Sequence, residues 1–401
     1  MAEVIEPIVL DKTLKETNAL LRMQNLFLGK MADMPAGITD YELLRKIVRN
    51  GSAPDFFNIG DQIIVPWTDK AENVDYQMPF DVAHFMKTDT KGESGIPSMV
   101  LHSHFVIPFG IQFSQYQAFY YAEDGLAAGT YHIKGGTTWG QFTKGEFYQF
   151  TLTEPVPAGG QLAGFRDVAD GSPVTSKTVQ SFASPSSPTA IETVAISIGD
   201  DGTYLGEMAS DSTAELNALQ SVGYGYNRWS QSAYRQWLNS DKQDWWEPQS
   251  NYDRPPTEAS TKWGFLSGFD PEFLEIIKPT KVITAKNTLI DDGKLEDTYD
   301  RFFLPSKEEI YNTPQLAGEG GNWDYWKQRL GLPSETANHP SVYPEYIKYG
   351  LEAQSTAYTW RLRSATRGSS GYVWTVSSTG YVYDGIARYS YRSAPACRIG
   401  G

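Results

Sequence analysis

The sequence has few cysteines and histidines, the residues that form disulfide bonds or bind metal ions. Its 401 residues contain one cysteine, Cys397, which excludes an intrachain disulfide and suits folding in a reducing compartment. Only five histidines are available for general-base or metal chemistry. His102 and His104 have the period-2 spacing that places two ligands on one strand face, as zinc requires, but a satisfied structural pair explains them as well. The inventory therefore favours a non-enzymatic protein without a cofactor.

Positive charge and long apolar runs are also missing. A formal net charge of -14 gives nucleic acid and anionic membranes no overall attraction. No window of about 18 apolar residues exists, and the start of the chain is acidic where a secretory signal needs positive charge. We therefore expect no nucleic-acid partner, no membrane insertion and no signal peptide.

Two common catalytic motifs are absent. No Gly-x-Ser-x-Gly elbow supports a serine hydrolase. The glycines of residues 318–321 lack the following Lys and Ser or Thr of a phosphate-binding loop, so a surface loop is expected there.

Aromatic residues are abundant, with 11 Trp and 24 Tyr. Such usage favours β-rich, loop-rich architecture, and the chain length suits two or three domains. Leucines recur every seven residues over residues 11–31, which predicts either a self-associating helix, compatible with a trimer, or a helix packed on its own domain. A capping box at residues 39–42 predicts a second helix through Ile47.

Four further patterns indicate secondary structure. Residues 58–66 and 80–85 read as an early hairpin, and residues 129–133 and 146–152 as strands of a separate β domain whose tail, 181–188, is a loop. Residues 227–239 predict a short helix entered through Ser230 or Ser232. A second capping box, at residues 306–309, predicts another helix. From residue 358 onward, period-2 alternation with Gly and Ser turns predicts strands and loops.

Four segments together carry a family resemblance. They are Arg-Trp-Ser-Gln-Ser-Ala-Tyr-Arg-Gln-Trp-Leu-Asn at 228–239, Phe-Leu-Pro-Ser at 303–306, Leu-Arg-Ser-Ala at 362–365 and Ala-Pro-Ala-Cys-Arg-Ile at 394–399. In this order they resemble the C-type-lectin-fold variable proteins of diversity-generating retroelements, of which phage tropism determinants are one kind. The resemblance implies an α+β chain with a C-type-lectin-like fold at its C-terminus, an inserted β-rich domain and N-terminal helices.

The implied domains have definite boundaries. Residues 1–54 would form a helical assembly segment, 55–91 the first strands of the lectin-like domain, 92–208 the inserted domain, and 209–401 the remainder with a variable region at 358–401. In the family, this last segment is rewritten at codons whose adenines are mutagenised while the scaffold between them stays fixed.

The composition of residues 359–401 provides an independent check. This stretch has no Lys, Glu, Gln or Met. Codons obtained from AAC by changing its adenines encode Tyr, Asp, Gly, Ile, Arg, Ser and Thr but none of those four. Strand and turn segments are depleted in Lys and Glu for other reasons, which is the alternative explanation. That alternative leaves the missing Gln and Met unexplained.

Two interleaved sets of residues follow. The expected fixed scaffold is Leu362, Ser364, Val373, Val376, Gly380, Val382, Ala387, Ala394 and Pro395. The expected displayed, ligand-binding set is Thr366, Arg367, Ser369, Ser370, Tyr372, Thr375, Ser377, Thr379, Tyr381, Tyr383, Asp384, Ile386, Arg388, Tyr389, Tyr391 and Arg392. Tyrosine with adaptable Ser and Gly makes a good binding surface, and the six arginines of the segment would give it positive charge.

These sets predict a binding protein. The resemblance implies a phage or prophage receptor-binding protein, assembled in the bacterial cytoplasm and carried on the virion surface, on a tail fibre or the capsid, beside other virion proteins. Its partner would be a host cell-surface protein or glycan, bound by a homo-oligomer. The alternatives are a structural virion decoration protein without a variable site, and an enzyme related to formylglycine-generating enzymes.

The sequence lacks the functional motifs of two other groups of proteins with that fold. Formylglycine-generating enzymes need a pair of cysteines, and this chain has one, expected in a buried final strand. Calcium-dependent sugar lectins carry Glu-Pro-Asn or Gln-Pro-Asp followed by Trp-Asn-Asp, whereas this chain has Glu-Pro-Gln at 247–249 and Asn-Trp-Asp at 322–324. We expect no calcium-mediated sugar binding, although a structural Ca²⁺ remains compatible with the sequence.

Overall fold

The computed structural model describes residues 40–115, 120–135, 143, 145–163, 178–182, 188–197, 201–208, 225–250, 253–331 and 343–401. Within these residues the protein is a mixed α+β structure. The leucine-patterned segment 11–31, the first residue of the capping box at 39–42 and most of the expected loop at 181–188 lie outside the described residues. No helix among the described residues is long and apolar enough to cross a membrane.

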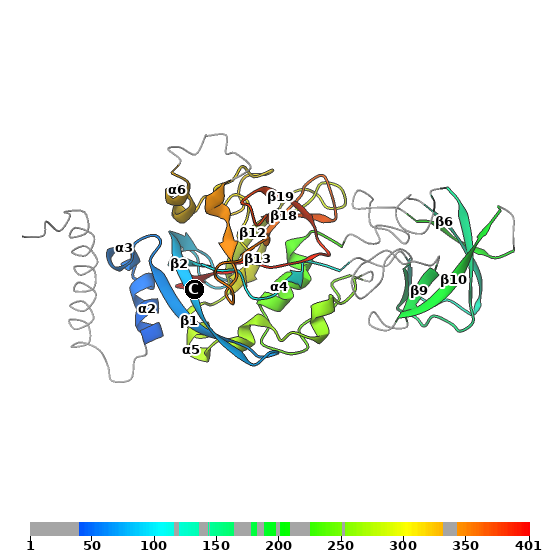
Figure 1. Ribbon diagram of the computed structural model, residues 1–401, viewed down its shortest axis with the longest axis horizontal. Coiled ribbons are helices and arrows are strands. Elements are labelled where there is room, and N and C mark those ends of the chain that lie inside the picture. The colour runs from blue at the N-terminus through cyan, green and yellow to red at the C-terminus, as the bar shows by residue number, and fades with distance from the viewer. Residues whose placement is uncertain are drawn as a thin grey trace, which may run out of the picture.

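A five-stranded sheet forms the centre of the main body. Its strand order is β1-β2-β3-β21-β14, with every neighbouring pair antiparallel. The strands are β1 (Gln62–Asp69), β2 (Val74–Thr88), β3 (Ile96–Ser103), β21 (Ala396–Ile399) and β14 (Phe302–Phe303). The β1–β2 pair confirms the predicted hairpin. Because β21 pairs with β3, the end of the chain returns to the sheet that its first strands begin (Figure 1).

The boundary of the inserted domain differs from the expected residue 92. Strand β3 is almost completely buried and pairs with β2 on one side and β21 on the other. Strand β4 (Ile111–Gln112) also belongs to the main body, because it pairs with β20 (Ser390–Tyr391). The change in sequence texture near residue 92 therefore marks a turn between paired strands, and the separate sheet begins only at Tyr120.

Short helices surround the central sheet. They are α2 (Asp40–Arg49), α3 (Ala53–Phe56), α4 (Ala233–Leu238), α5 (Pro271–Ile276) and α6 (Asp324–Leu330), with single 3-10 turns η1 (Trp229–Gln231), η2 (Thr257–Ser260), η3 (Phe265–Gly268) and η4 (Pro344–Tyr346). The side chain of Ser232 accepts a hydrogen bond from the Arg235 amide at 3.1 Å, which confirms Ser232 as the cap of α4. Helix α2 matches the second predicted helix.

The helix predicted at residue 306 does not form. The reciprocal bonds of the capping box are present, since Ser306 N donates to Glu309 Oε2 at 2.9 Å and Glu309 N to Ser306 Oγ at 3.0 Å. The chain then leaves the helical region at Tyr311, whose φ is 61°. The Glu309 carboxylate is also used elsewhere, in a fully buried ion pair with Arg363. A tertiary contact has therefore stopped the helix after one turn.

Two aromatic clusters fill the core. Phe265 lies 5.0 Å from both Trp237 and Phe302, joining α4 and η3 to the central sheet. On the other side, the ring of His102 lies within 6.0 Å of Trp326 and Trp360. Large rings bury much apolar area for little lost rotamer freedom, so these clusters fix the positions of the loops around the sheet.

A three-stranded antiparallel sheet carries most of the C-terminal segment. It consists of β17 (Trp360–Ala365), β18 (Tyr372–Val376) and β19 (Val382–Ile386), with β18 in the middle. Two small hairpins lie in the same body, β12 (Thr280–Ala285) with β13 (Leu295–Asp300), and β15 (Lys348–Tyr349) with β16 (Ala357–Tyr358). The strands predicted beyond residue 358 are thus confirmed.

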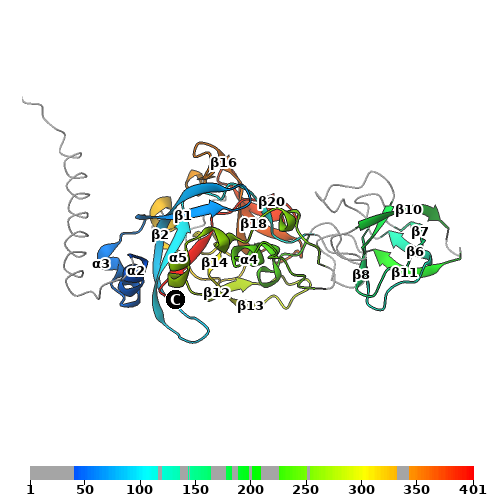
Figure 2. The same cartoon turned by 90° about the horizontal axis from the view of Figure 1, so that it is seen from below.

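A separate seven-stranded sheet lies at the end of the molecule opposite α2 and α3 (Figures 1 and 2). Its order is β11-β6-β7-β10-β9-β8-β5. The strands are β5 (Tyr120–Ala122), β6 (Gly129–Gly135), β7 (Phe147–Leu152), β8 (Gly160–Ala163), β9 (Thr178–Phe182), β10 (Pro188–Ile196) and β11 (Thr203–Met208). Both strands predicted here, at 129–133 and 146–152, are confirmed as β6 and β7.

Candidate functional site: a tyrosine surface on the C-terminal sheet

Burial distinguishes the expected scaffold of the C-terminal sheet from most of the expected displayed set. All nine expected scaffold residues are buried, including Leu362, Val373 and Val376 at 0% exposure. In β18 and β19, Trp374 stands opposite Asp384 and Thr375 opposite Tyr383. Because side chains alternate between the faces of a strand, Thr375 and Tyr383 lie on one face of the sheet and Trp374 and Asp384 on the other.

Four tyrosines form a continuous group, here called the tyrosine patch: Tyr381, Tyr383, Tyr389 and Tyr391. The rings of Tyr381 and Tyr383 stack with centroids 5.9 Å apart and planes 7° from parallel. Those of Tyr389 and Tyr391 meet edge to face at 6.0 Å. Burial and a hydrogen bond with Tyr383 raise the pKa of Tyr391, which joins the two pairs. Tyr381 and Tyr389 are 43% and 41% exposed.

Arg361 supports the tyrosine patch from below. This residue of β17 is fully buried, and its guanidinium lies 4.6 Å from the centroid of Tyr391. It donates to the carbonyl oxygens of Gly385, Ile386 and Tyr389 at 2.9 to 3.1 Å. Burial lowers the pKa of Arg361 to about 10, so the group stays charged at neutral pH. One cation therefore holds both the loop after β19 and an aromatic ring of the patch.

Trp374 and Lys307 lie beside Asp384 and were not expected from the sequence. The Lys307 ammonium lies 3.5 Å from the centroid of the Trp374 ring, on the strand position paired with Asp384. Burial lowers the pKa of Lys307 to about 8, against the raising influence of Glu319 and Asp384. Lys307 lies outside the variable-looking segment, so no pattern in that segment could identify it.

A partly shielded acid lies beside the tyrosine patch. Ser390 donates its hydroxyl to Glu258 of η2, and the amide of Gln112 donates to the same carboxylate at 3.4 Å. Burial raises the pKa of Glu258 despite these bonds. Glu258 is thus an acid beside Ser390, which lies between Tyr389 and Tyr391 of the patch.

The loop between β17 and β18 lies beside the other end of the sheet. Asn227 is fully buried and its side-chain amide donates to the carbonyl oxygens of Thr366, Ser369 and Tyr372 at 2.7 to 3.1 Å. Its own carbonyl accepts from Asn287 at 3.0 Å. The expected residues of this loop are therefore held at the end of the sheet where Tyr372 pairs with Ile386, whereas Tyr381 follows the turn at the other end.

Four residues expected on the displayed surface are buried instead. Ser369, Ser370, Thr375 and Arg388 are 7%, 1%, 0% and 3% exposed. Thr375 shows the reason, because its hydroxyl donates to the Tyr383 carbonyl at 2.9 Å and so belongs to the sheet interior. A polar side chain fits the interior where a local backbone group satisfies it. The exposed or half-exposed members are Thr366, Arg367, Tyr372, Ser377, Thr379, Tyr381, Tyr383, Asp384, Ile386, Tyr389, Tyr391 and Arg392.

The arginines of the segment do not form the positive surface expected from composition. Arg361, Arg363, Arg388 and Arg398 are all at most 3% exposed. Arg392 pairs with Glu352 at 2.5 Å, and Arg367 donates to the Gly293 carbonyl at 2.6 Å. Five of the six arginines of the segment bind backbone carbonyls or acids, and the guanidinium of Arg388 lies 4.8 Å from the centroid of the Tyr389 ring.

The two histidines considered as zinc ligands and the single cysteine lie in surroundings that suit a structural role. His102 is fully buried among aromatic rings, while His104 contacts Asp81 through Nδ1 at 2.9 Å. Among the described residues, no three or more His, Cys, Asp or Glu side chains are grouped so that they could hold a metal ion. Cys397 is fully buried in β21 as expected, and burial raises its pKa, which makes it a poor nucleophile.

Residues 207–400 match the family described as Domain of unknown function (DUF6273). This range includes the three-stranded sheet, the tyrosine patch and the last strand of the central sheet. No curated protein and no solved structure matches the chain.

Proposed function

We propose that the chain is a binding protein whose tyrosine patch contacts a macromolecular ligand, in the manner of a phage or prophage receptor-binding protein that docks a host surface protein or glycan. The observation that carries this proposal is the contrast in burial between the tyrosine patch and the scaffold residues. Four contiguous tyrosines face outward over a scaffold whose valines, alanines and Arg361 are buried. Residues on the surface can then change without repacking the interior.

The chemistry of the tyrosine patch suits a protein or glycan. Tyrosine combines a broad apolar ring with a hydroxyl that donates and accepts hydrogen bonds, and it loses little rotamer entropy on binding. The rings of the patch already contact each other, so part of their ordering cost is met before a ligand arrives. Several copies on one particle would raise a weak single-site affinity by avidity.

The arrangement of strands supports a C-type-lectin-like scaffold as part of the same proposal. The last strand, β21, returns to pair with β3 in the sheet begun by the first strands, and a separate three-stranded sheet displays the preceding segment. In the resembling family, this is the segment that varies. The missing Lys, Glu, Gln and Met of residues 359–401 agree with variation at adenines.

Changing the tyrosine patch tests the proposal directly. We expect simultaneous Tyr381→Ser, Tyr383→Ser, Tyr389→Ser and Tyr391→Ser substitutions to abolish adhesion of the labelled full chain to intact bacterial cells of susceptible strains, measured by flow cytometry. The melting temperature should change little, because each tyrosine stands outside the buried scaffold.

A matched control replaces two tyrosines elsewhere, Tyr204 in β11 and Tyr299 in β13, by serine. This variant should adhere as the unchanged chain does. Unaltered adhesion of the patch variant would overturn the proposed binding surface, and a collapse of its melting temperature would show that the rings are part of the core.

The proposal that the displayed residues vary by adenine mutagenesis is tested by the sequence of the gene and its neighbourhood. A near-identical repeat of the coding segment should carry adenines at the codons of Tyr381, Tyr383, Asp384, Tyr389 and Tyr391, close to a reverse-transcriptase gene. Codons of the buried Val376, Val382 and Ala387 should lack them. A neighbourhood without such a repeat would leave a binding surface that does not vary by this mechanism.

A further inference from the structure

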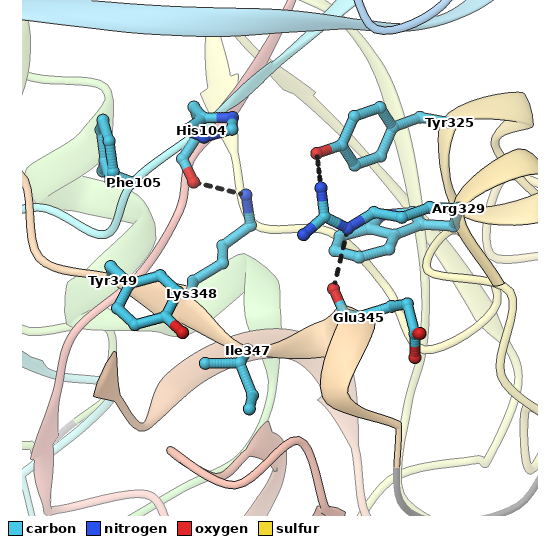
Figure 3. A pocket seen from close by; sticks show the side chains of 9 residues that line it. His104, Phe105, Tyr325, Arg329, Glu345, Ile347, Lys348 and Tyr349 are labelled. Carbon is cyan, nitrogen blue, oxygen red and sulfur yellow. Dashed lines mark hydrogen bonds between the residues drawn. The ribbon is translucent and has the colours of Figure 1, made fainter. Parts of the chain in front are cut away.

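A second site lies away from the tyrosine patch, where η4, β15 and the end of α6 meet the chain after β3. It is a pocket with a cavity volume of about 90 Å³, and its lining includes His104, Tyr325, Arg329 and Lys348 (Figure 3). A water molecule occupies about 30 Å³ in the liquid, so the space suits one group of a few heavy atoms and is too small for a nucleotide.

Lys348 forms the floor of this pocket. It is 4% exposed, and its ammonium donates to the carbonyl oxygens of Ser103 at 2.5 Å and His104 at 3.1 Å. An ammonium has three N–H donors. Among the described residues, no further acceptor is found for the third donor, and the rings of Trp326 and Trp360 lie 5.7 and 5.9 Å from the nitrogen. One donor of a buried cation thus remains for something in the cavity.

Arg329 forms the rim. It is exposed at the end of α6, where Nε donates to the Glu345 carbonyl at 3.0 Å and Nη1 to the Tyr325 hydroxyl at 3.1 Å. These two bonds fix the plane of the guanidinium. Figure 3 shows its third nitrogen turned toward the Lys348 ammonium, while the Glu345 carboxylate points away from both cations. Burial lowers the pKa of Lys348, Asp81 acts in the opposite direction, and the positive charge of Arg329 lowers this pKa further.

Asp81, the carboxylate near Lys348, already has hydrogen-bond partners. Asp81 is 1% exposed, and its two carboxylate oxygens lie 2.9 Å from His104 Nδ1, while Gln62 donates to Oδ1 at 3.0 Å. No ion pair from Asp81 to Lys348 or Arg329 is found within 4 Å in the described structure. The pocket therefore presents two cations beside one buried carboxylate, which has hydrogen-bond partners in His104, Gln62 and Tyr325 and partly offsets the charge of Lys348.

We propose that this pocket binds a small oxyanion, a carboxylate or phosphate group, bridged by the Lys348 ammonium below and the Arg329 guanidinium above. A bound oxyanion would supply the acceptor that the third Lys348 donor lacks and would offset the repulsion between the two cations. The Tyr325 hydroxyl fixes the guanidinium from the side. On a chain of net charge -14, such local positive potential marks a specific site, since general attraction for anions is absent.

Thermal unfolding of the full chain tests the site. Sodium phosphate and sodium acetate are titrated separately at constant ionic strength against sodium chloride. We expect one of the two anions to raise the melting temperature saturably, and the one that does so identifies phosphate or carboxylate as the group bound. Arg329→Gln should raise the apparent Kd about tenfold, because one charge-assisted contact is lost at an exposed position where folding is not threatened.

Lys327→Gln is the matched control, since it removes an exposed cation two residues away on the same helix. It should leave the anion response unchanged, as should the tyrosine-patch variant. No saturable response to either anion would overturn the proposal, and so would an Arg329→Gln variant that responds as the unchanged chain does. An equal loss of anion affinity in Lys327→Gln would show that the anions respond to the general surface charge and would also overturn the proposal.

Discussion

At the scale of single residues, the buried ion pair of Arg363 and Glu309 shows how a charge in the interior is compensated. Arg363 pairs with Glu309, and both are fully buried, while Arg363 also donates to the Leu304 carbonyl at 2.7 Å. Lys348 differs from this pattern, because its ammonium has two carbonyl acceptors and no carboxylate within 4 Å among the described residues. A buried cation with incomplete compensation makes stability depend on pH.

We predict that Lys348→Met removes part of this pH dependence. Burial, with the repulsion of Arg329, lowers the pKa of Lys348 to about 7 against the raising influence of Asp81. The unfolded lysine has a pKa of about 10.4, so between these values the unfolded chain binds one more proton and the free energy of unfolding rises with pH by roughly 1 kcal/mol per unit. His104 and Tyr325 also line the site and are present in both proteins.

Urea unfolding at a series of pH values above neutrality measures the difference. The unchanged chain should gain stability relative to Lys348→Met as the pH rises, because the cost of the buried lysine is full below the folded pKa of about 7 and falls to zero as the pH approaches the unfolded pKa of about 10.4. Parallel pH curves for the two proteins would contradict the assignment of a lowered pKa to Lys348.

At the scale of elements, the sequence predicted where strands form. It did not predict the features that depend on contacts between distant parts of the chain. The apolar character of Val373, Val376 and Val382 is enough to identify them as buried, and the sequence pattern also predicted the β1–β2 hairpin. It did not reveal that Thr375 points inward, because a local carbonyl satisfies its hydroxyl. Nor could it show the Lys348 pocket, whose lining comes from segments more than 200 residues apart in the chain.

Asn227 provides the element-scale prediction. Its side chain joins the loop after β17 to the β12–β13 hairpin region through three carbonyl acceptors and Asn287. Asn227→Ala would leave buried carbonyl groups without a donor, so we expect a loss of about 2 to 3 kcal/mol in the free energy of unfolding. Thr379→Ala, at an exposed turn of the same sheet, should cost less than about 0.5 kcal/mol.

Chemical denaturation followed by tryptophan fluorescence compares the two variants. Because Asn227 holds the backbone of Thr366, Ser369 and Tyr372, its loss should also increase hydrogen exchange in that loop more than in β19. Equal stability of the two variants would mean that water replaces the Asn227 amide without cost.

At the scale of the whole molecule, the fold consists of a body and a laterally placed sheet (Figures 1 and 2). The sequence predicted an inserted β domain but put its start at residue 92. The two described ends of the insertion lie together in the body, since a Cβ added to Gly225 would stand 2.4 Å from the Ser114 carbonyl oxygen. Only tertiary pairing could reveal the true boundary, because nothing in the sequence of β3 shows that it pairs with β2 and β21.

This closeness predicts that the body folds without the insertion. Replacing residues 116–224 by a short Gly-Ser linker should give a soluble protein that keeps the tyrosine patch, because the ends already meet and a short loop has a small closure cost. Gln161 donates to the Asp253 carbonyl at 3.3 Å, so the shortened protein loses at least this contact with the body. Its near-ultraviolet circular dichroism should retain the signal of the tryptophan core, and its adhesion to cells should match that of the full chain. A shortened protein that unfolds would show that the seven-stranded sheet stabilises the body, and one that folds without adhering would assign binding to the insertion instead of the tyrosine patch.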